Sequence, residues 1–217
     1  MKKIPISKTM CLFVNSMILI FLFNILVKAQ NDKNKIYNDL INKYGKITSI
    51  ESSFQDETNF SGKCKLKAKI GNKYSINIAE NKIVCDGKTI WNYNQKRKNV
   101  VVSDFTTEIG GITLDYFFFN VLENLEPISL KTQIPAENKN SGQKSYILEL
   151  QNKDKLSDIR QVNLFISSDL KKIDAIEIVT SSGSQKWKII NLLINKKISD
   201  SDFNFKVPEN VEVIDMR

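Results

Sequence analysis

The chain contains no histidine among its 217 residues. This absence excludes Ser-His and Cys-His nucleophile pairs, a histidine general base and imidazole ligands for a metal. A hydrolase that uses carboxylates alone remains open, although no acidic pair and no Ser-Lys spacing stands out. We therefore expect a protein that is not an enzyme and has no catalytic residues, no metal and no cofactor.

One short run could still bind a nucleotide, because Gly87-Lys88-Thr89 matches the end of a phosphate-binding loop. Such a loop needs a further glycine five positions before Gly87 and a helix after the threonine. The residue at that position is Lys82, and the residues after Thr89 alternate as in a strand. Both departures exclude a nucleotide site.

The same run is instead typical of a β-hairpin that presents aromatic side chains. Asp86-Gly87 lies between two apolar runs, and glycine supplies the positive φ that a tight primed turn requires. Trp91 and Tyr93 follow on the second strand, two residues apart and so on one face. The pattern predicts an aromatic surface that packs either in the protein's own core or against a guest molecule.

Residues 86–93 resemble the D-G-K-T-x-W-x-Y signature of the periplasmic outer-membrane lipoprotein carriers, the LolA-type family. Residues 202–208, followed by residues 211–214, resemble the F-x-F-x-x-P ending of that family, and Ser53-Phe54-Gln55 resembles its S-F-x-Q motif. The resemblance implies a mainly β, α+β fold: a single half-open antiparallel barrel, or curved sheet, covered by a few helices. It also implies a monomeric carrier that shuttles lipoproteins from the inner to the outer membrane.

A carrier of lipidated proteins needs a dry cavity for acyl chains, because each exposed methylene costs about 0.8 kcal/mol in water. We expect this cavity to be lined by eight residues: Tyr74, Ile76, Trp91, Tyr93, Leu114, Phe117, Phe118 and Val121. The alternative for each residue is an ordinary place in the core. Their occurrence in two segments that are expected to face one another favours the cavity.

The second of these segments, residues 112–125, has apolar residues at helical steps and follows Gly110-Gly111. It predicts either a core helix that caps the sheet or a lid on a glycine hinge. Many family members carry Arg-Pro before the strand that begins here at Tyr74, and that arginine helps to hold the lid shut. Ile70-Gly71 replaces the pair and Lys69 is adjacent, so we expect a different latch.

The elements that must position these residues follow from periodicity. Apolar residues at three- and four-residue steps predict a helix over 34–44, which Gly45 ends. Alternation and turn residues predict strands over 54–60, 63–70, 74–79, 83–85, 89–94, 99–103, 128–133, 144–150, 161–167, 173–180 and 185–194. The last of them is apolar on both faces, with Trp187, Ile189, Asn191 and Leu193 on one, which predicts a sheet covered on both sides.

The N-terminus combines Lys2, Lys3 and Lys8 with an apolar run from Met10 to Val27. We predict a signal peptide over 1–29 that is cleaved after Ala29, leaving one domain over 30–217 in the periplasm. An uncleaved membrane anchor is the alternative. The formal net charge of +8 falls to +4 without the four lysines of residues 1–29, and the basic run 96–98 favours a solvated loop over nucleic-acid binding.

Cys64 and Cys85 are expected on strands separated by a third strand, too far apart for a disulfide. The expected partners are lipidated lipoproteins, an inner-membrane ABC-type lipoprotein-releasing complex and an outer-membrane acceptor. A periplasmic regulator that senses lipid or lipoprotein on the same fold is the alternative function.

Overall fold

The structure is a computed structural model of the whole chain, and it describes residues 32–58, 62–106, 113–134 and 144–217. The predicted signal peptide and the Gly110-Gly111 hinge lie outside the described residues. Within those residues, no helix combines the length and the apolar composition needed to cross a membrane.

The described strands form one twelve-stranded sheet in the order β12-β6-β5-β4-β3-β2-β1-β11-β10-β9-β8-β7. Their bounds are β1 Ser49–Asp56, β2 Lys63–Lys69, β3 Lys73–Ile78, β4 Asn81–Asp86, β5 Thr89–Asn94, β6 Asn99–Asp104, β7 Leu125–Gln133, β8 Ser145–Asn152, β9 Ile159–Ile166, β10 Ile173–Thr180, β11 Ser184–Ile194 and β12 Glu212–Asp215. Every pairing is antiparallel except that of β12 with β6. The fold is the predicted one: a mainly β, open and curved sheet with a few helices.

The predicted hairpin at Asp86-Gly87 is confirmed. Gly87 has a φ of +102° between β4 and β5. The Asp86 carboxylate accepts hydrogen bonds from the backbone N–H groups of Lys88 and Thr89, both at 2.9 Å. This local turn places Cys85 opposite Ile90, which sets the register of the two strands.

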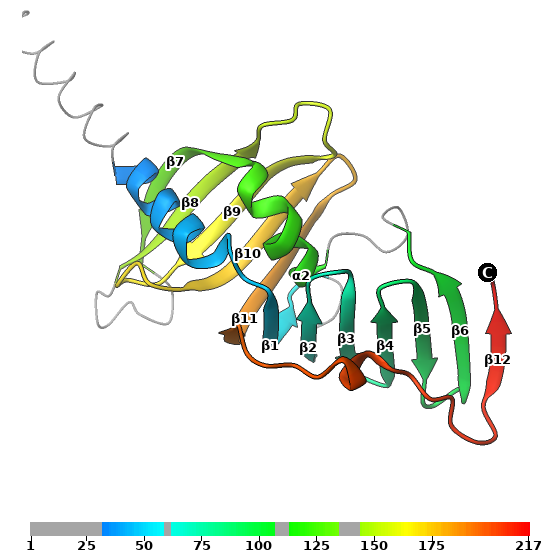
Figure 1. Cartoon of the computed structure of the whole chain (residues 1–217). Coiled ribbons are helices and arrows are strands. Elements are labelled where there is room, and N and C mark those ends of the chain that lie inside the picture. Colours follow the sequence, from blue (N-terminus) through cyan, green and yellow to red (C-terminus); the bar gives the residue numbers. More distant parts are fainter. Residues whose placement is uncertain (1–31, 59–61, 107–112, 135–143) are drawn as a thin grey trace, which may run out of the picture.

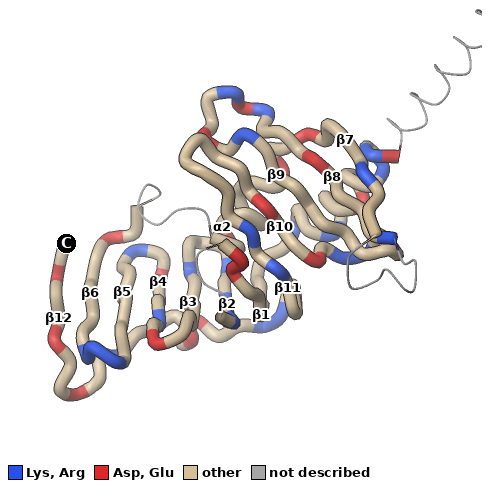
Figure 2. The backbone as a smooth tube through the Cα atoms, turned by 180° about the vertical axis from the view of Figure 1, so that it is seen from behind, with Lys and Arg blue, Asp and Glu red and all other residues tan. Residues whose placement is uncertain are grey.

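Two parts of the sheet differ in how they are covered (Figure 1). The body comprises β1–β3 and β7–β11, and its concave face carries a helix over residues 32–44 and the helical segment described below. The arm comprises β4–β6 and β12, which extend away from the body as a flatter sheet. Both parts carry charges of both signs (Figure 2), and the densest group of lysines among the strands is on β2, which has four lysines and no acid.

The main apolar cluster of the described residues lies in the body. It joins the helix over 32–44, where the predicted face of Ile36, Leu40 and Tyr44 is buried, to strands β1–β3 and β7–β11. No described residue of β4, β5, β6 or β12 belongs to this cluster. The arm therefore needs a separate cover for its buried residues.

That cover is the strap, residues 196–211, which leads from β11 to β12 and includes the 3-10 helix η4 (Asp200–Phe203). In Figure 1 it crosses the strands at their lower ends. Lys67 pairs with Asp202 at 3.0 Å, while Lys69 and Lys73 pair with Asp200 at 2.9 and 3.3 Å. These lysines alternate with Ala68 and Tyr74, so the strap lies on the face opposite the main cluster.

The prediction that β11 is covered on both faces is wrong. A β-bulge shifts the register, since Ser53 pairs with Asn191 and Phe54 with Ile189. The extra residue reverses the alternation beyond this point. Trp187, Ile189, Leu192 and Ile194 therefore face the main cluster, whereas Ile190 and Leu193 are 50% and 37% exposed.

Cys64 and Cys85, the cysteines of the part of the chain that the structure describes, are both free and buried. Cys64 lies on β2 and Cys85 on β4, with β3 between them, as predicted. The two thiols therefore lie too far apart for a disulfide.

Candidate functional site

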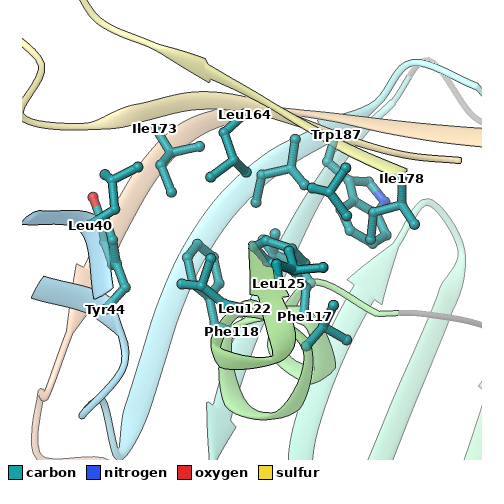
Figure 3. Packing of buried hydrophobic residues seen from close by; sticks show 14 of the residues in the cluster. Leu40, Tyr44, Phe117, Phe118, Leu122, Leu125, Leu164, Ile173, Ile178 and Trp187 are labelled. Carbon is teal, nitrogen blue, oxygen red and sulfur yellow. The ribbon is translucent and has the colours of Figure 1, made fainter. Parts of the chain in front are cut away.

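The helical segment, residues 114–124, lies between the helix over 32–44 and the sheet of the body (Figure 3). Phe117 and Phe118 are 0% and 2% exposed, and their rings meet edge to face at 5.3 Å. Phe118 also packs on Tyr44, with 5.4 Å between ring centroids. Trp187 belongs to the same cluster on the sheet side. The segment thus fills the concave face with aromatic and aliphatic side chains.

The predicted single helix over 112–125 is divided into three short elements in the described part. These are α2 (Leu114–Tyr116), the π-helix η1 (Phe117–Val121) and the 3-10 helix η2 (Leu122–Asn124). The Thr113 hydroxyl caps the start by accepting a hydrogen bond from the Tyr116 N–H at 3.4 Å. A helical segment whose hydrogen-bond pattern changes twice within eleven residues is less stable by itself than a regular α-helix of the same length.

Polar contacts hold only one end of this segment to other described residues. The Tyr37 hydroxyl donates to the backbone carbonyls of Leu122 and Leu125, at 3.3 and 2.6 Å. The ammonium and the backbone N–H of Lys153 donate to the carbonyls of Glu123 and Asn124, at 2.8 and 3.0 Å. From residue 113 to residue 121, the hydrogen bonds among described residues are local, and the rest of the attachment is apolar packing.

One polar group is buried at the other, apolar-packed end. Asp115 is 6% exposed, and burial raises the pKa of its carboxyl to about 6 against weaker opposing effects of the Thr113 hydroxyl and nearby backbone N–H groups. The charge of Asp115 acts on Tyr74 and Cys85, whose pKa values are raised chiefly by burial, that of Cys85 to about 11. The site therefore has an apolar interior with a small polar group of residues at one end.

The structure brings together six of the eight predicted lining residues. Ile76, Leu114, Phe117, Phe118 and Val121 are buried in the main cluster, and Tyr74 packs against it. The strand and helical residues that were expected to face one another do so in the body.

The other two, Trp91 and Tyr93, lie on the opposite face of the sheet. Tyr74 pairs with Cys85 and Cys85 with Ile90, so Trp91 shares a face with its own partner Val84. Both aromatic rings pack on Phe205 of the strap, with centroids at 6.3 Å for Trp91 and 5.8 Å for Tyr93. The hairpin was predicted correctly. The face of the sheet on which Trp91 and Tyr93 lie, however, depends on the register between β3 and β4, which the sequence of the hairpin alone does not reveal.

Three residues that contact or belong to this region were not anticipated from the sequence: Tyr37, Asp115 and Trp187. Asp115 could have been noticed as the single acid within the run from Ile112 to Leu122. The role of Tyr37 depends on a distant contact with Leu125, for which the sequence carries no local signal.

Four surface pockets among the described residues have volumes of about 400, 600, 610 and 690 Å³. None of these four is lined by any of the eight predicted residues. The helical segment occupies the concave face itself, so a guest at this place must displace it.

Lys69, next to the Ile70-Gly71 pair, does not contact the segment. It pairs with Asp200 of the strap at 2.9 Å, on the other face of the sheet. The anchoring contacts of the segment come from Tyr37 and Lys153 instead.

A sequence model of the family described as "Outer membrane lipoprotein carrier protein LolA" matches residues 55–206. The chain belongs to this family. It is 28% identical over 192 residues to an outer-membrane lipoprotein carrier protein of Histophilus somni (strain 129Pt), covering 83% of this chain and 87% of that protein. It is 29% identical over 140 residues to the carrier protein of Pasteurella multocida (strain Pm70), covering 64% and 62%.

Among solved structures, a conserved protein of Thermus thermophilus superposes with a TM-score of 0.48 and 11% identity, over 84% of this chain and 98% of that one. Membership of the LolA family rests on the sequence match, and the geometry of the site rests on this chain's own residues.

Proposed function

We propose that the protein binds the acyl chains of lipidated proteins on the concave face of the body and carries them across the periplasm from the inner to the outer membrane. The observation that carries this proposal is the attachment of the helical segment: apolar packing along residues 113–121, with polar anchors only near residues 122–125. A cover of this kind can swing about its anchored end and leave an apolar surface for a guest.

The energies of the exchange support reversible binding. An acyl chain of about fourteen methylenes gains about 11 kcal/mol on leaving water, at about 0.8 kcal/mol for each methylene. Displacing Leu114, Phe117, Phe118 and Val121 from their buried positions costs about 1.5–3 kcal/mol each, or about 6–12 kcal/mol in total. The near balance of these terms lets a carrier both accept and release its cargo without a nucleotide.

The names of the related proteins and the sequence pattern together suggest where the carrier works. The signal peptide over 1–29 directs the domain over 30–217 to the periplasm, where an inner-membrane ABC-type complex loads it and an outer-membrane acceptor unloads it. The protein performs no catalysis in this scheme, because binding and release are sufficient.

The two tryptophans of the chain allow a direct test of the site. Trp187 lies in the main cluster, whereas Trp91 lies under the strap, so Trp91→Phe and Trp187→Phe each leave one reporter. A peptide acylated with a brominated chain should quench Trp187 fluorescence in the first variant and leave Trp91 fluorescence unchanged in the second. Quenching of Trp91 alone would place the acyl chain on the opposite face and contradict the proposal.

A second experiment tests transport. The protein is incubated with inner-membrane vesicles that contain lipoprotein and its loading complex, and release of lipoprotein is measured. Phe118→Glu should abolish release. If the buried charge prevents this variant from folding, Phe118→Ala is used in its place. Leu156→Glu is the control, because Leu156 is 95% exposed. Normal release by folded Phe118→Glu would contradict displacement of the segment, and binding without release would favour a lipid-sensing regulator.

A further inference from the structure

The carboxyl group of Asp115 is buried, and few neighbouring groups offset the cost of removing it from water. Asp115 is 6% exposed, and its Oδ1 atom is buried with no hydrogen-bond partner among the described residues. Burying such an acceptor without a partner costs free energy that an apolar residue of similar size would not cost. The position is therefore unfavourable for the empty protein.

The groups around Asp115 do not neutralise it. Burial is the largest cause of the raised pKa of Asp115, and the weaker opposing interactions come from the Thr113 hydroxyl and backbone N–H groups, none of them from a lysine or an arginine of the described residues. Burial chiefly raises the pKa values of the nearby Tyr74 hydroxyl and Cys85 thiol, and the charge of Asp115 adds to both shifts. Cys85 accepts from the Gly87 N–H at 3.4 Å.

The location of Asp115 matches the polar end of an acyl ligand. It follows Leu114 and precedes Phe117 and Phe118, so the free acceptor lies beside the surface proposed for acyl chains. It also lies toward the end of the segment that no polar anchor from another described element holds. Asp115 moves with this end when a ligand lifts it, so its Oδ1 can meet the head group of the ligand as the segment packs again over the acyl chain.

Three kinds of acyl compound would meet this carboxylate differently. A free fatty acid is an anion near neutral pH and is repelled by a second negative charge. An ester offers only acceptors, which leaves Oδ1 without a partner. An N-acyl amide offers one N–H donor next to its chain, and hydrogen bonds to charged acceptors are the stronger kind.

We propose that Asp115 Oδ1 accepts a hydrogen bond from the amide N–H that joins an acyl chain to a peptide, so that the site selects N-acylated peptides. This inference rests on the proposed function and adds the class of acyl linkage that the site prefers. Asp115 supplies specificity, whereas the aromatic and aliphatic residues supply most of the affinity.

The test compares methyl N-hexadecanoylglycinate with methyl O-hexadecanoylglycolate, which differ only in an N–H replaced by an oxygen, and with hexadecanoate. Binding to the full protein is followed by Trp187 fluorescence in the Trp91→Phe background. We expect the amide to bind about tenfold or more tightly than the ester. Equal affinities for these two compounds would overturn the inference while leaving acyl binding intact, whereas no binding of any compound would overturn the proposed function.

Three variants sharpen the result. Asp115→Leu removes the acceptor, so the preference for the amide should fall to within about twofold. Asp115→Asn keeps an Oδ1 acceptor without the charge, so it should retain part of the preference and bind hexadecanoate more tightly than the unsubstituted protein. Glu123→Gln, an exposed acid of the same segment, should leave the ratio unchanged. A preference that survives in Asp115→Leu would contradict the role of Asp115.

Discussion

The body and the arm cover their sheets in different ways. In the body, the helical segment is attached at residues 122–125 by Tyr37 and Lys153 and otherwise by packing. The strap, which covers the arm, is instead held along its length: Asp200 and Asp202 form ion pairs with lysines of the neighbouring strands β2 and β3, and Phe205 packs on Trp91 and Tyr93. A cover with polar anchors near one end only can be displaced by a guest, whereas one held by ion pairs and ring packing along its length stays in place. Both regions bury aromatic residues, so burial alone does not identify a binding site.

The largest expected effect comes from the arm. Phe203 of the strap is 1% exposed, so Phe203→Ala should lower the free energy of unfolding by about 3–5 kcal/mol. Urea denaturation gives this value, and hydrogen exchange should become faster in β4–β6. Acyl-chain binding should change less than about twofold, because the body is intact, and Val207→Ala, at an exposed position, is the control. A parallel loss of acyl binding would break the distinction between the two regions.

The pH dependence of stability should differ in sign between the regions. The Asp115 carboxyl has a pKa raised from 3.8 to about 6, so between these values the folded protein holds a proton that the unfolded chain has released. Stability therefore falls as pH rises from about 4 to 6, by about 3 kcal/mol in total, and stays low above that range. Asp115→Asn should remove this fall in urea titrations at several pH values.

Asp200 in the strap provides the contrast. Hydrogen bonds from Lys69 and Lys73 lower the pKa of its carboxyl, so its contribution is present above the ordinary value of 3.8 and is lost as pH falls below it. Asp200→Asn should reduce the loss of stability in acid and leave the fall between about pH 4 and 6 unchanged. A flat profile over that interval in the unsubstituted protein would contradict the burial of Asp115.

A smaller effect is expected at the anchor of the helical segment. Tyr37→Phe removes the buried hydroxyl that contacts the carbonyls of Leu122 and Leu125, which should cost about 1–2 kcal/mol. Hydrogen exchange should become faster in residues 114–124 while β4–β6 are unaffected. Tyr93→Phe keeps the ring against Phe205 and is the matched control in the arm. Unchanged exchange in the segment would show that packing alone positions it.

The smallest effect concerns the ion pairs of the strap. Asp202→Asn removes a partly exposed pair with Lys67, which should cost less than about 1 kcal/mol and only at low salt. Thermal denaturation at low and high sodium chloride concentration measures this difference. Glu80→Gln, which breaks the looser pair with Lys96 at 3.8 Å, should show a still smaller change.

Features set by neighbouring residues could be predicted from the sequence. The turn at Asp86-Gly87 depends on a local glycine conformation and a local side-chain cap, and the buried face of residues 32–44 depends on helical spacing. The meander and the helical spacing of Leu114, Phe117, Phe118 and Val121 follow from the same kind of information. The family resemblance supplied two further predictions, that the sheet is curved and that the helix over it can be displaced.

Features set by distant pairing could not be predicted in this way. The face on which Trp91 and Tyr93 lie depends on the register from β3 through β5, and Phe205, which covers them, comes from the strap. The bulge at Ile190 depends on how β11 meets β1, which the alternation within β11 does not reveal. The isolation of Asp115 likewise depends on groups that three separate elements bring near it.

The parallel pairing of β12 with β6 has a consequence for the order in which the molecule is completed. Glu212 lies opposite Asn99 and Asp215 opposite Val102, so the last strand of the chain joins one from its middle. Because a polypeptide is synthesised from its amino end, the free edge of β6 is exposed before β12 is available to pair with it. During that interval the exposed edge of β6 can pair with strands of other molecules. Pairing with β12 then covers this edge and protects the protein against aggregation.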